Sequence, residues 1–265
     1  MSEQRVGERV VLRSEGSRVR VLTLNRPASR NALDGALYEA MLSAVRTVAS
    51  EPEVRAVVLT GAGEAFSAGG DFGLIQRMQE DAELRRATLD QGRSLFWSLL
   101  ALDVPVIAAV NGAAVGAGAT LALLCDIVLM AEDAYLAEPR VSIGLVPGDG
   151  SAILWPMLAG VPAARSYLLT GDRMPAQDAH RLGLVHRVVQ RRTVLTEAKA
   201  LAERLADLSA HSVRSTKRAL NLQVEAAARA GFEAALHAEE QSFETPELRR
   251  TVQNHIDRAG GAGGA

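Results

Sequence analysis

The two stretches of sequence that decide the fold are Phe66-Ser67-Ala68-Gly69-Gly70-Asp71 and Asn111-Gly112-Ala113-Ala114-Val115-Gly116-Ala117-Gly118-Ala119-Thr120. Each stretch follows an apolar, strand-like run, 56–60 and 106–110, and each leads into a helix-like segment. A strand that breaks at small residues and starts a helix leaves unpaired backbone N–H groups pointing outward. Two such turns that face one another predict a pocket for a carbonyl oxygen that gains negative charge during a reaction.

Strand and helix patterns alternate on both sides of these loops. The patterns predict a hairpin at 10–24, strands at 54–60, 106–110, 127–130, 134–137 and 184–189, helices at 35–50, 82–100 and 176–182, and two short helices within 152–169. Alternation up to about residue 190 predicts an α/β layered core. From Thr193 onward the chain favours helix alone, which leaves these last helices with no sheet to cover.

Composition excludes several classes of protein. The 265 residues suffice for one full core, and 48% are hydrophobic and 23% charged. A net charge of −2 provides no basic field for nucleic acid or an anionic membrane surface. No apolar run is long enough to cross a bilayer, and Met1–Arg13 lacks the apolar core of a signal peptide, so a cytoplasmic location is expected. The single cysteine, Cys125, excludes an internal disulfide, and no metal-ligand spacing is present, so no metal is expected.

An ordered set of motifs between residues 10 and 190 resembles the crotonase family, also called the enoyl-CoA hydratase/isomerase superfamily. The motifs are 24–27 with 31–33, 57–61, 66–71, 105–112, 125–127, 169–172 and 183–185. The resemblance implies a spiral of ββα units over 1–192 and a C-terminal helical oligomerisation region over 193–259, with a flexible tail at 260–265. It also implies a homotrimer or homohexamer and an acyl-CoA substrate, with CoA as part of that substrate rather than a separate cofactor.

The resemblance also assigns site residues by position. The backbone N–H groups of Gly70 and Ala117 would form the oxyanion hole, and both residues suit this role because glycine permits close approach and a helix start favours negative charge. For the CoA moiety, Arg26 and Arg30 flank the loop that lies beside the nucleotide in the family, and Ala68 lies in the first loop. Lys217 resembles a position that reaches the CoA of a neighbouring subunit.

Two positions depart from the pattern of the family's hydratases, which use two glutamates to hold a water and protonate carbon. Thr120 and Arg140 stand where those glutamates are found. Threonine is not a useful base at neutral pH, and arginine stays protonated. The ordinary pair of acid and base is therefore missing, although the fold and the thioester site are still expected.

Two other carboxylates are candidates to replace the pair. Asp149 lies on a glycine-flanked turn beyond the strand that Arg140 is expected to enter, and it either acts on the substrate or caps the following helix. Glu138 is two residues from Arg140, so on an extended chain both side chains face the same way. Arg140 could bind a substrate carboxylate or an enolate, or pair with a neighbouring acid.

These residues leave three functions open. The leading hypothesis is an acyl-CoA enzyme that stabilises a thioester enolate and hydrates or isomerises an enoyl-CoA, of which isomerisation needs only one acid/base group. The second is a C–C bond hydrolase, because the run Pro147-Gly148-Asp149-Gly150 is similar to a subgroup that includes a β-diketone hydrolase, although that enzyme has histidine at the position of Arg140. The third is a CoA-binding homologue with little turnover. An RNA-binding precedent in the family is disfavoured by the mildly acidic charge.

Overall fold

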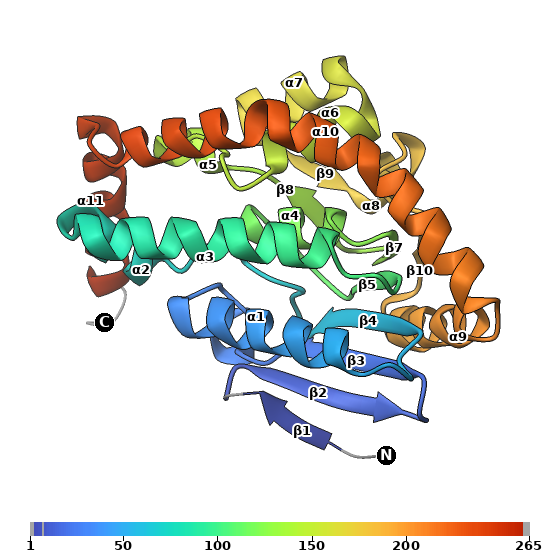
Figure 1. Ribbon diagram of the computed structural model, residues 1–265. Coiled ribbons are helices and arrows are strands. Elements are labelled where there is room, and N and C mark those ends of the chain that lie inside the picture. Colours follow the sequence, from blue (N-terminus) through green and yellow to red (C-terminus); the bar gives the residue numbers. More distant parts are fainter. Residues whose placement is uncertain (1–2, 7, 262–265) are drawn as a thin grey trace.

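A seven-stranded sheet forms the centre of the molecule in the computed structural model, which describes residues 3–6 and 8–261 (Figure 1). Its strands, in spatial order, are β1 (Glu3–Val6), β2 (Val10–Glu15), β3 (Val19–Leu24), β4 (Ala56–Gly61), β5 (Val106–Val110), β7 (Ile127–Ala131) and β10 (Arg187–Val189). The first three strands pair antiparallel and the pairs from β3 to β10 are parallel. The expected α/β fold is therefore confirmed.

Helices cover both faces of this sheet, which explains why its central strands are almost entirely apolar. Along β4, Val57 and Leu59 face the core shared with α1 (Gly35–Ser50) and α3 (Ala82–Leu100). Ala56 and Val58 face the opposite way, toward α9 (Val194–Ala206). The expectation that no sheet remains for the C-terminal helices is therefore wrong for α9.

A smaller sheet and a group of short helices lie above the main sheet, in the region that contains the two small-residue loops and the residues around Arg140. The sheet has the order β6 (Ala114–Val115), β8 (Tyr135–Ala137) and β9 (Arg173–Pro175). The helices of this region are α2 (Phe72–Glu80), α4 (Ala117–Leu123), α5 (Arg140–Ile143), α6 (Ser151–Ala159), α7 (Val161–Thr170) and α8 (Ala176–Arg181), with single 3-10 turns at Pro27–Ser29 and Arg191–Thr193 elsewhere. The break between α6 and α7 at Gly160 is where the sequence predicts it.

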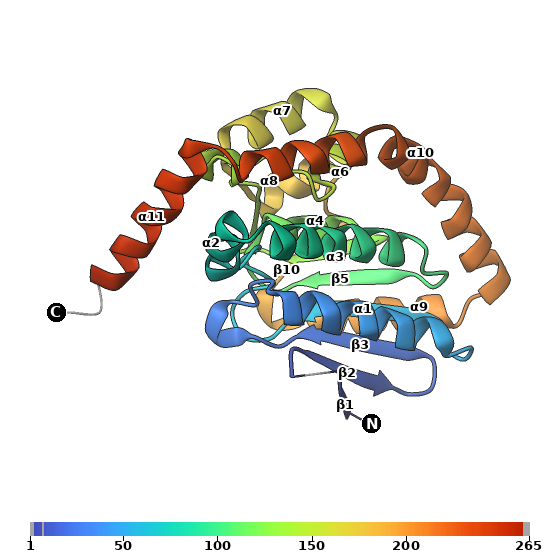
Figure 2. The same cartoon turned by 60° about the vertical axis from the view of Figure 1, so that its left-hand side comes forward.

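The last two helices return to the site from the far end of the chain. The long helix α10 (Ala210–Ser242) runs from α9 across the top of the molecule and buries Phe232 and Leu236 in the main core (Figure 1). From its end, α11 (Pro246–Gly261) extends away from the body (Figure 2), while Leu248 packs in a cluster with residues of α2.

Three details of the sequence prediction need correction. Arg140 begins the helix α5, with Pro139 as the N-cap, and is not on an extended segment. The strands β1, β6 and β9 are additional to those that the sequence predicts, whereas α2 is the helix-like segment expected after the first loop. Of the tail at 260–265, residues 260–261 belong to α11 and residues 262–265 lie outside the described residues. No helix in the described part of the chain combines the length and apolar character needed to cross a membrane.

Candidate functional site

The two small-residue loops lie side by side, as the sequence predicts. The amide of Ser67 donates to Ala113 O at 3.1 Å, and the amide of Val115 donates back to Ser67 O at 2.9 Å. A Cβ added to Gly118 would lie only 2.7 Å from Cβ of Ser67. The two loops can therefore approach this closely only because position 118 carries no side chain.

Two backbone N–H groups at this junction are free to bind a ligand. Gly70 lies on the exposed side of the first loop, and Ala117 is the first residue of α4, whose first turn cannot satisfy its own N–H groups. Within the described residues neither N–H has a hydrogen-bond acceptor. Gly116 turns the chain into α4 with a φ of +52°, a conformation that favours glycine.

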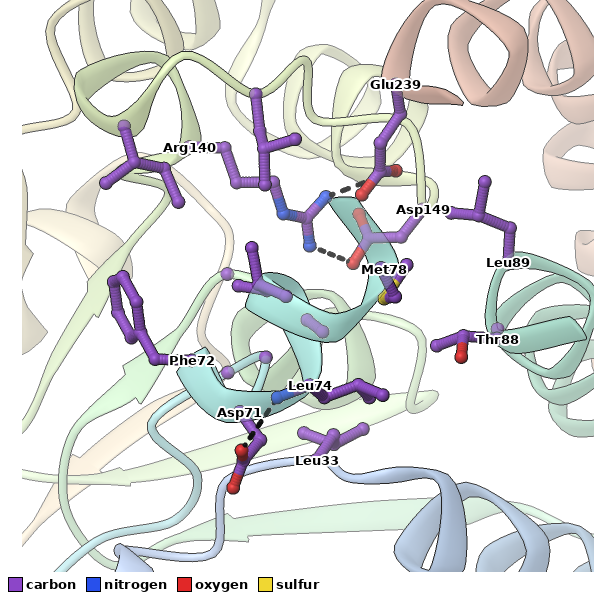
Figure 3. Close-up of a pocket in the computed structure, with 18 of the residues that line it drawn as sticks. Leu33, Asp71, Phe72, Leu74, Met78, Thr88, Leu89, Arg140, Asp149 and Glu239 are labelled. Carbon is purple, nitrogen blue, oxygen red and sulfur yellow. Dashed lines mark hydrogen bonds and ion pairs between the residues drawn. The ribbon is translucent and has the colours of Figure 1, made fainter. Parts of the chain in front are cut away.

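Both residues border one pocket, whose empty volume is about 930 Å³ when the solvent at its open mouth is included. One part of its wall is apolar and comes from α2 and α3, with Leu74, Met78 and Leu89 among the lining residues (Figure 3). Phe243, at the end of α10, also lines the pocket. Another part of the wall is polar and carries the side chains of Arg140, Asp149 and Glu239. An apolar cavity with a few convergent polar groups is the usual form of a small-molecule site.

Arg140 is the centre of the polar wall. Its Nη2 donates to Oδ2 of Asp149, its Nε lies 3.4 Å from Oε1 of Glu138, and its Nη1 lies 4.0 Å from Oε2 of Glu239. The charge of this arginine is therefore surrounded by carboxylates of its own chain. The alternative that Arg140 pairs with neighbouring acids is the one that the structure contains.

The two candidate carboxylates differ in their access to the pocket. Asp149 lines it, whereas Glu138 is 0% exposed and its Oε2 accepts a hydrogen bond of 2.5 Å from Ser151 Oγ. Thr120 donates to Oδ1 of Asp149 at 3.0 Å and lies 2.7 Å from Ser151 Oγ. Thr120, Glu138 and Ser151 thus form a buried layer behind Asp149, and only Asp149 faces the cavity.

Their surroundings also separate the pKa values of these carboxyls. Burial alone would raise the pKa of Asp149, but the charge and hydrogen bond of Arg140, with the Thr120 hydroxyl, hold that pKa below its ordinary value. Burial raises the pKa of Glu138, and Arg140 only partly offsets this effect. Asp149 is therefore an ionised carboxylate at neutral pH.

Sequence reasoning missed one acidic residue of the site. Glu239 lies on α10, and its Oε2 accepts a hydrogen bond of 3.1 Å from Gly148 N. The apolar stripe of α10 passes through Phe232, Leu236 and Phe243, and Glu239 falls on the same helical face. An acid within an apolar stripe was the signal available in the sequence. Among the described residues no cluster of His, Cys, Asp and Glu has the arrangement of a metal site.

The residues expected to contact CoA have different surroundings. Arg30 is exposed, and its carbonyl accepts the amide of Ala68 beside the first loop. Arg26 is engaged within the chain, with Nη2 at 3.3 Å from Asp34 and 3.2 Å from Asp71.

Lys217 is buried, and its Nζ donates to Val104 O at 2.9 Å and to Asp126 Oδ2 at 2.7 Å. The expectation that Lys217 reaches CoA has no support in this geometry, since its ammonium already has two partners.

Known proteins of one family match this chain over most of its length. A family model described as Enoyl-CoA hydratase/isomerase matches residues 14–260. The chain is similar to an enoyl-CoA hydratase/isomerase from Mycobacterium paratuberculosis, with 42% identity, a TM-score of 0.90 and coverage of 94% of this chain and 98% of the other. It is 37% identical to the 2,3-dehydroadipyl-CoA hydratase of Escherichia coli K12 over 83% of this chain and 84% of the relative. A monofunctional enoyl CoA isomerase from M. smegmatis is 33% identical, with a TM-score of 0.71 and coverage of 83% and 95%.

Proposed function

The chain belongs to the enoyl-CoA hydratase/isomerase family, and from the arrangement of its pocket we propose that it moves the double bond of an enoyl-CoA thioester. The thioester oxygen would bind between the N–H groups of Gly70 and Ala117. The Asp149 carboxylate would remove a proton from the α-carbon, and the N–H groups would hold the negative oxygen of the enolate.

One observation carries this proposal. Two unpaired backbone N–H groups and one ionised carboxylate border the same apolar pocket. Donors fixed in advance at the position of a developing oxyanion stabilise a transition state, and each such donor typically contributes about 3–4 kcal/mol. Glu138 is sealed from the pocket, and Asp71, which also lines it, caps α2 and pairs with Arg26, so Asp149 is the candidate base.

Isomerisation fits these residues better than hydration by the usual route. Hydration requires one group that holds and deprotonates a water and another that protonates carbon. Thr120 is not a base, and Arg140 stays protonated beside its carboxylate partners, which raise its pKa against the effect of burial. A single carboxylate can carry a proton from one carbon to another.

The substrate class is inferred from the apolar wall of the pocket and from an arginine beside the first loop. The apolar wall formed by α2, α3 and α10 suits an apolar acyl chain. The exposed guanidinium of Arg30, next to the first loop, suits a phosphate of CoA, since arginine forms paired, charge-assisted hydrogen bonds with phosphate oxygens. Arg26 would contribute only after release from its two aspartates.

Two substrates test the proposal. Trans-3-hexenoyl-CoA gains the absorbance of a conjugated thioester on isomerisation, and crotonyl-CoA loses it on hydration. We expect turnover of the first by the wild type and loss of that turnover in Asp149→Asn, with unchanged binding of hexanoyl-CoA by calorimetry.

Three other results would contradict the proposal in distinguishable ways. Turnover of crotonyl-CoA alone would identify a hydratase. Cleavage of a cyclic β-diketone, with no affinity for CoA thioesters, would identify a C–C bond hydrolase. Affinity for hexanoyl-CoA without turnover of any probe would identify a CoA-binding homologue.

A further inference from the structure

Glu239 reaches the pocket from a distant part of the chain. It lies on α10, ninety residues beyond Asp149, and it lines the cavity on the same side as Arg140 (Figure 3). Its Oε2 accepts the 3.1 Å hydrogen bond from Gly148 N, and its Oε1 has no hydrogen-bond partner among the described residues. One oxygen of this carboxyl is therefore held in place and the other remains available.

The approach of α10 to the Asp149 loop is built into the sequence. A Cβ at Gly148 would lie 2.5 Å from Ala235 O, and 2.7 Å from Oε2 of Glu239. Contacts that short do not occur, so only glycine at position 148 allows the helix to pack here. The loop that presents Asp149 and the helix that presents Glu239 are thus fitted to each other.

Arg140 lies between the carboxyl groups of Asp149 and Glu239, but it contacts Asp149 more closely. Its Nη2 donates directly to Asp149, whereas its Nη1 is 4.0 Å from Glu239 (Figure 3). Asp149 also accepts hydrogen bonds from the hydroxyl of Thr120 and from the backbone amide of Ser151. Asp149 therefore has several donors that favour its charged form, and Glu239 has one amide.

This asymmetry separates the protonation states of the pair. Burial raises the pKa of Glu239 to about 7, against the attraction of Arg140, and the charges of Asp149 and Glu138 act in the same direction as burial. Carboxyl groups whose surroundings move their pKa values apart can serve as base and acid in one site.

Other charged groups around Glu239 are already paired. Of those that border the pocket, Arg93 of α3 pairs with Asp90 and Glu233, and Asp71, the N-cap of α2, pairs with Arg26. Tyr38 of α1 also borders the pocket and is uncharged at neutral pH, since burial raises the pKa of its hydroxyl. Arg140, Asp149 and Glu138 therefore dominate the electrostatic environment of Glu239.

We propose that Glu239 is a second catalytic residue, the acid that works with the base Asp149 on the same substrate. This inference rests on the proposed function. In the step from a 3-enoyl to a 2-enoyl thioester, the Asp149 carboxylate takes a proton from C2, and the C–H electrons form the dienolate. The protonated Glu239 then gives its proton to C4, whose new C–H bond takes the dienolate electrons. Asp149 is left protonated and Glu239 ionised, and one proton passed from the first to the second through water restores the enzyme.

The test compares Glu239→Gln with Glu240→Gln. Glutamine keeps an acceptor for Gly148 N but cannot donate a carboxyl proton, and Glu240 is on the same helix with its carboxylate 3.8 Å from Arg86 at the surface. For trans-3-hexenoyl-CoA we expect a loss of kcat of roughly 10²- to 10⁴-fold in Glu239→Gln and none in Glu240→Gln. The wild type and Glu240→Gln should lose activity above about pH 7, where Glu239 ionises, and Glu239→Gln should lack this decline.

An isotope measurement separates a catalytic role from a structural one. The substrate is deuterated at C2. If separate residues remove and donate the proton, the deuterium is released to solvent. If one residue does both, part of the deuterium is carried to C4. We expect release in the wild type and partial transfer in the residual turnover of Glu239→Gln. A wild type that transfers the label, or a Glu239→Gln variant within threefold of wild type with the same pH decline, would overturn the inference while leaving the proposed function intact. Absence of wild-type isomerisation would overturn both.

Discussion

The guanidinium of Arg140 donates from Nη2 to Oδ2 of Asp149, nine residues later in the chain. Arg140 stands where the family's hydratases carry a glutamate, and the structure shows what the arginine does instead. It keeps a neighbouring carboxylate ionised and turned toward the pocket. Under the proposed function, the acid/base group would therefore lie on the loop that Arg140 holds and not at position 140.

Arg140→Gln should destabilise the fold in a pH-dependent way. Removal of the cation leaves the buried carboxyls of Asp149, Glu138 and Glu239 without compensation, and breaking a buried ion pair costs about 3–5 kcal/mol. The pKa of Asp149 is lowered in the wild type, so its stabilisation is present above its ordinary pKa and is lost as pH falls. Urea unfolding should therefore show a larger difference from wild type at pH 6 than at pH 3, because only the second value lies below the ordinary pKa of an aspartate. A difference that does not change with pH would contradict this account.

Ala117→Pro should remove one oxyanion donor with little effect on the fold. Proline lacks the N–H group but is well tolerated at the first position of a helix, which Ala117 occupies in α4. Loss of one donor typically lowers kcat about 10²- to 10³-fold. Ala117→Gly keeps the N–H and is the matched control, measured by isomerase turnover and thermal unfolding. Equal activity of the two variants would exclude the N–H of Ala117 from catalysis.

The sequence predicts most of the fold because its signals are local. Asp34 caps α1 through the amide of Leu37, and Gly160 separates α6 from α7, as the pattern of caps and breakers indicates. The extended path expected at Arg140 is wrong because a single helical turn of four residues is too short to show a period. The placement of α9 against the sheet is a long-range contact, which local patterns do not encode.

The candidate site is only partly visible in the sequence for the same reason. Family position predicts that Gly70 and Ala117 are the oxyanion donors, and in the structure both residues line the pocket. Whether Asp149 or Glu138 faces the cavity depends on how the chain turns after Pro139, and only the fold decides it in favour of Asp149. Glu239 is not identified from the sequence because its partners, Gly148 and Arg140, lie 91 and 99 residues earlier in the chain.

Asn31→Ala should destabilise the junction beneath the first loop. The fully buried Asn31 side chain donates to Ala62 O and Ala65 O, both at 2.9 Å, and accepts Arg26 N at 2.9 Å. Its φ of +55° also suits asparagine better than alanine. Loss of the partner of Ala62 O and of Arg26 N, with only a long 3.4 Å hydrogen bond from Asn111 Nδ2 left at Ala65 O, should lower the free energy of unfolding in urea by about 2–4 kcal/mol.

Asn31→Gly distinguishes the two contributions at this position. Glycine loses the same hydrogen bonds but adopts a positive φ without strain. The free energy of unfolding of Asn31→Gly should therefore exceed that of Asn31→Ala by about 1–2 kcal/mol. A glycine variant as stable as wild type would mean that the side-chain hydrogen bonds add nothing.

Glu239→Gln should change the dependence of stability on pH. Burial raises the pKa of Glu239 from 4.5 to about 7, so the folded protein binds this proton more tightly than the unfolded chain does. The resulting stabilisation is complete below about pH 4.5 and is lost as pH rises through 7. Because glutamine does not ionise, the free energy of unfolding of the variant should rise relative to that of the wild type between pH 5 and pH 8. Above pH 8 the difference between the two proteins should stay constant. Urea unfolding at five pH values measures this pH dependence of stability, with Glu240→Gln as the control. A variant that follows wild type in parallel at every pH would show that Glu239 does not titrate in this range.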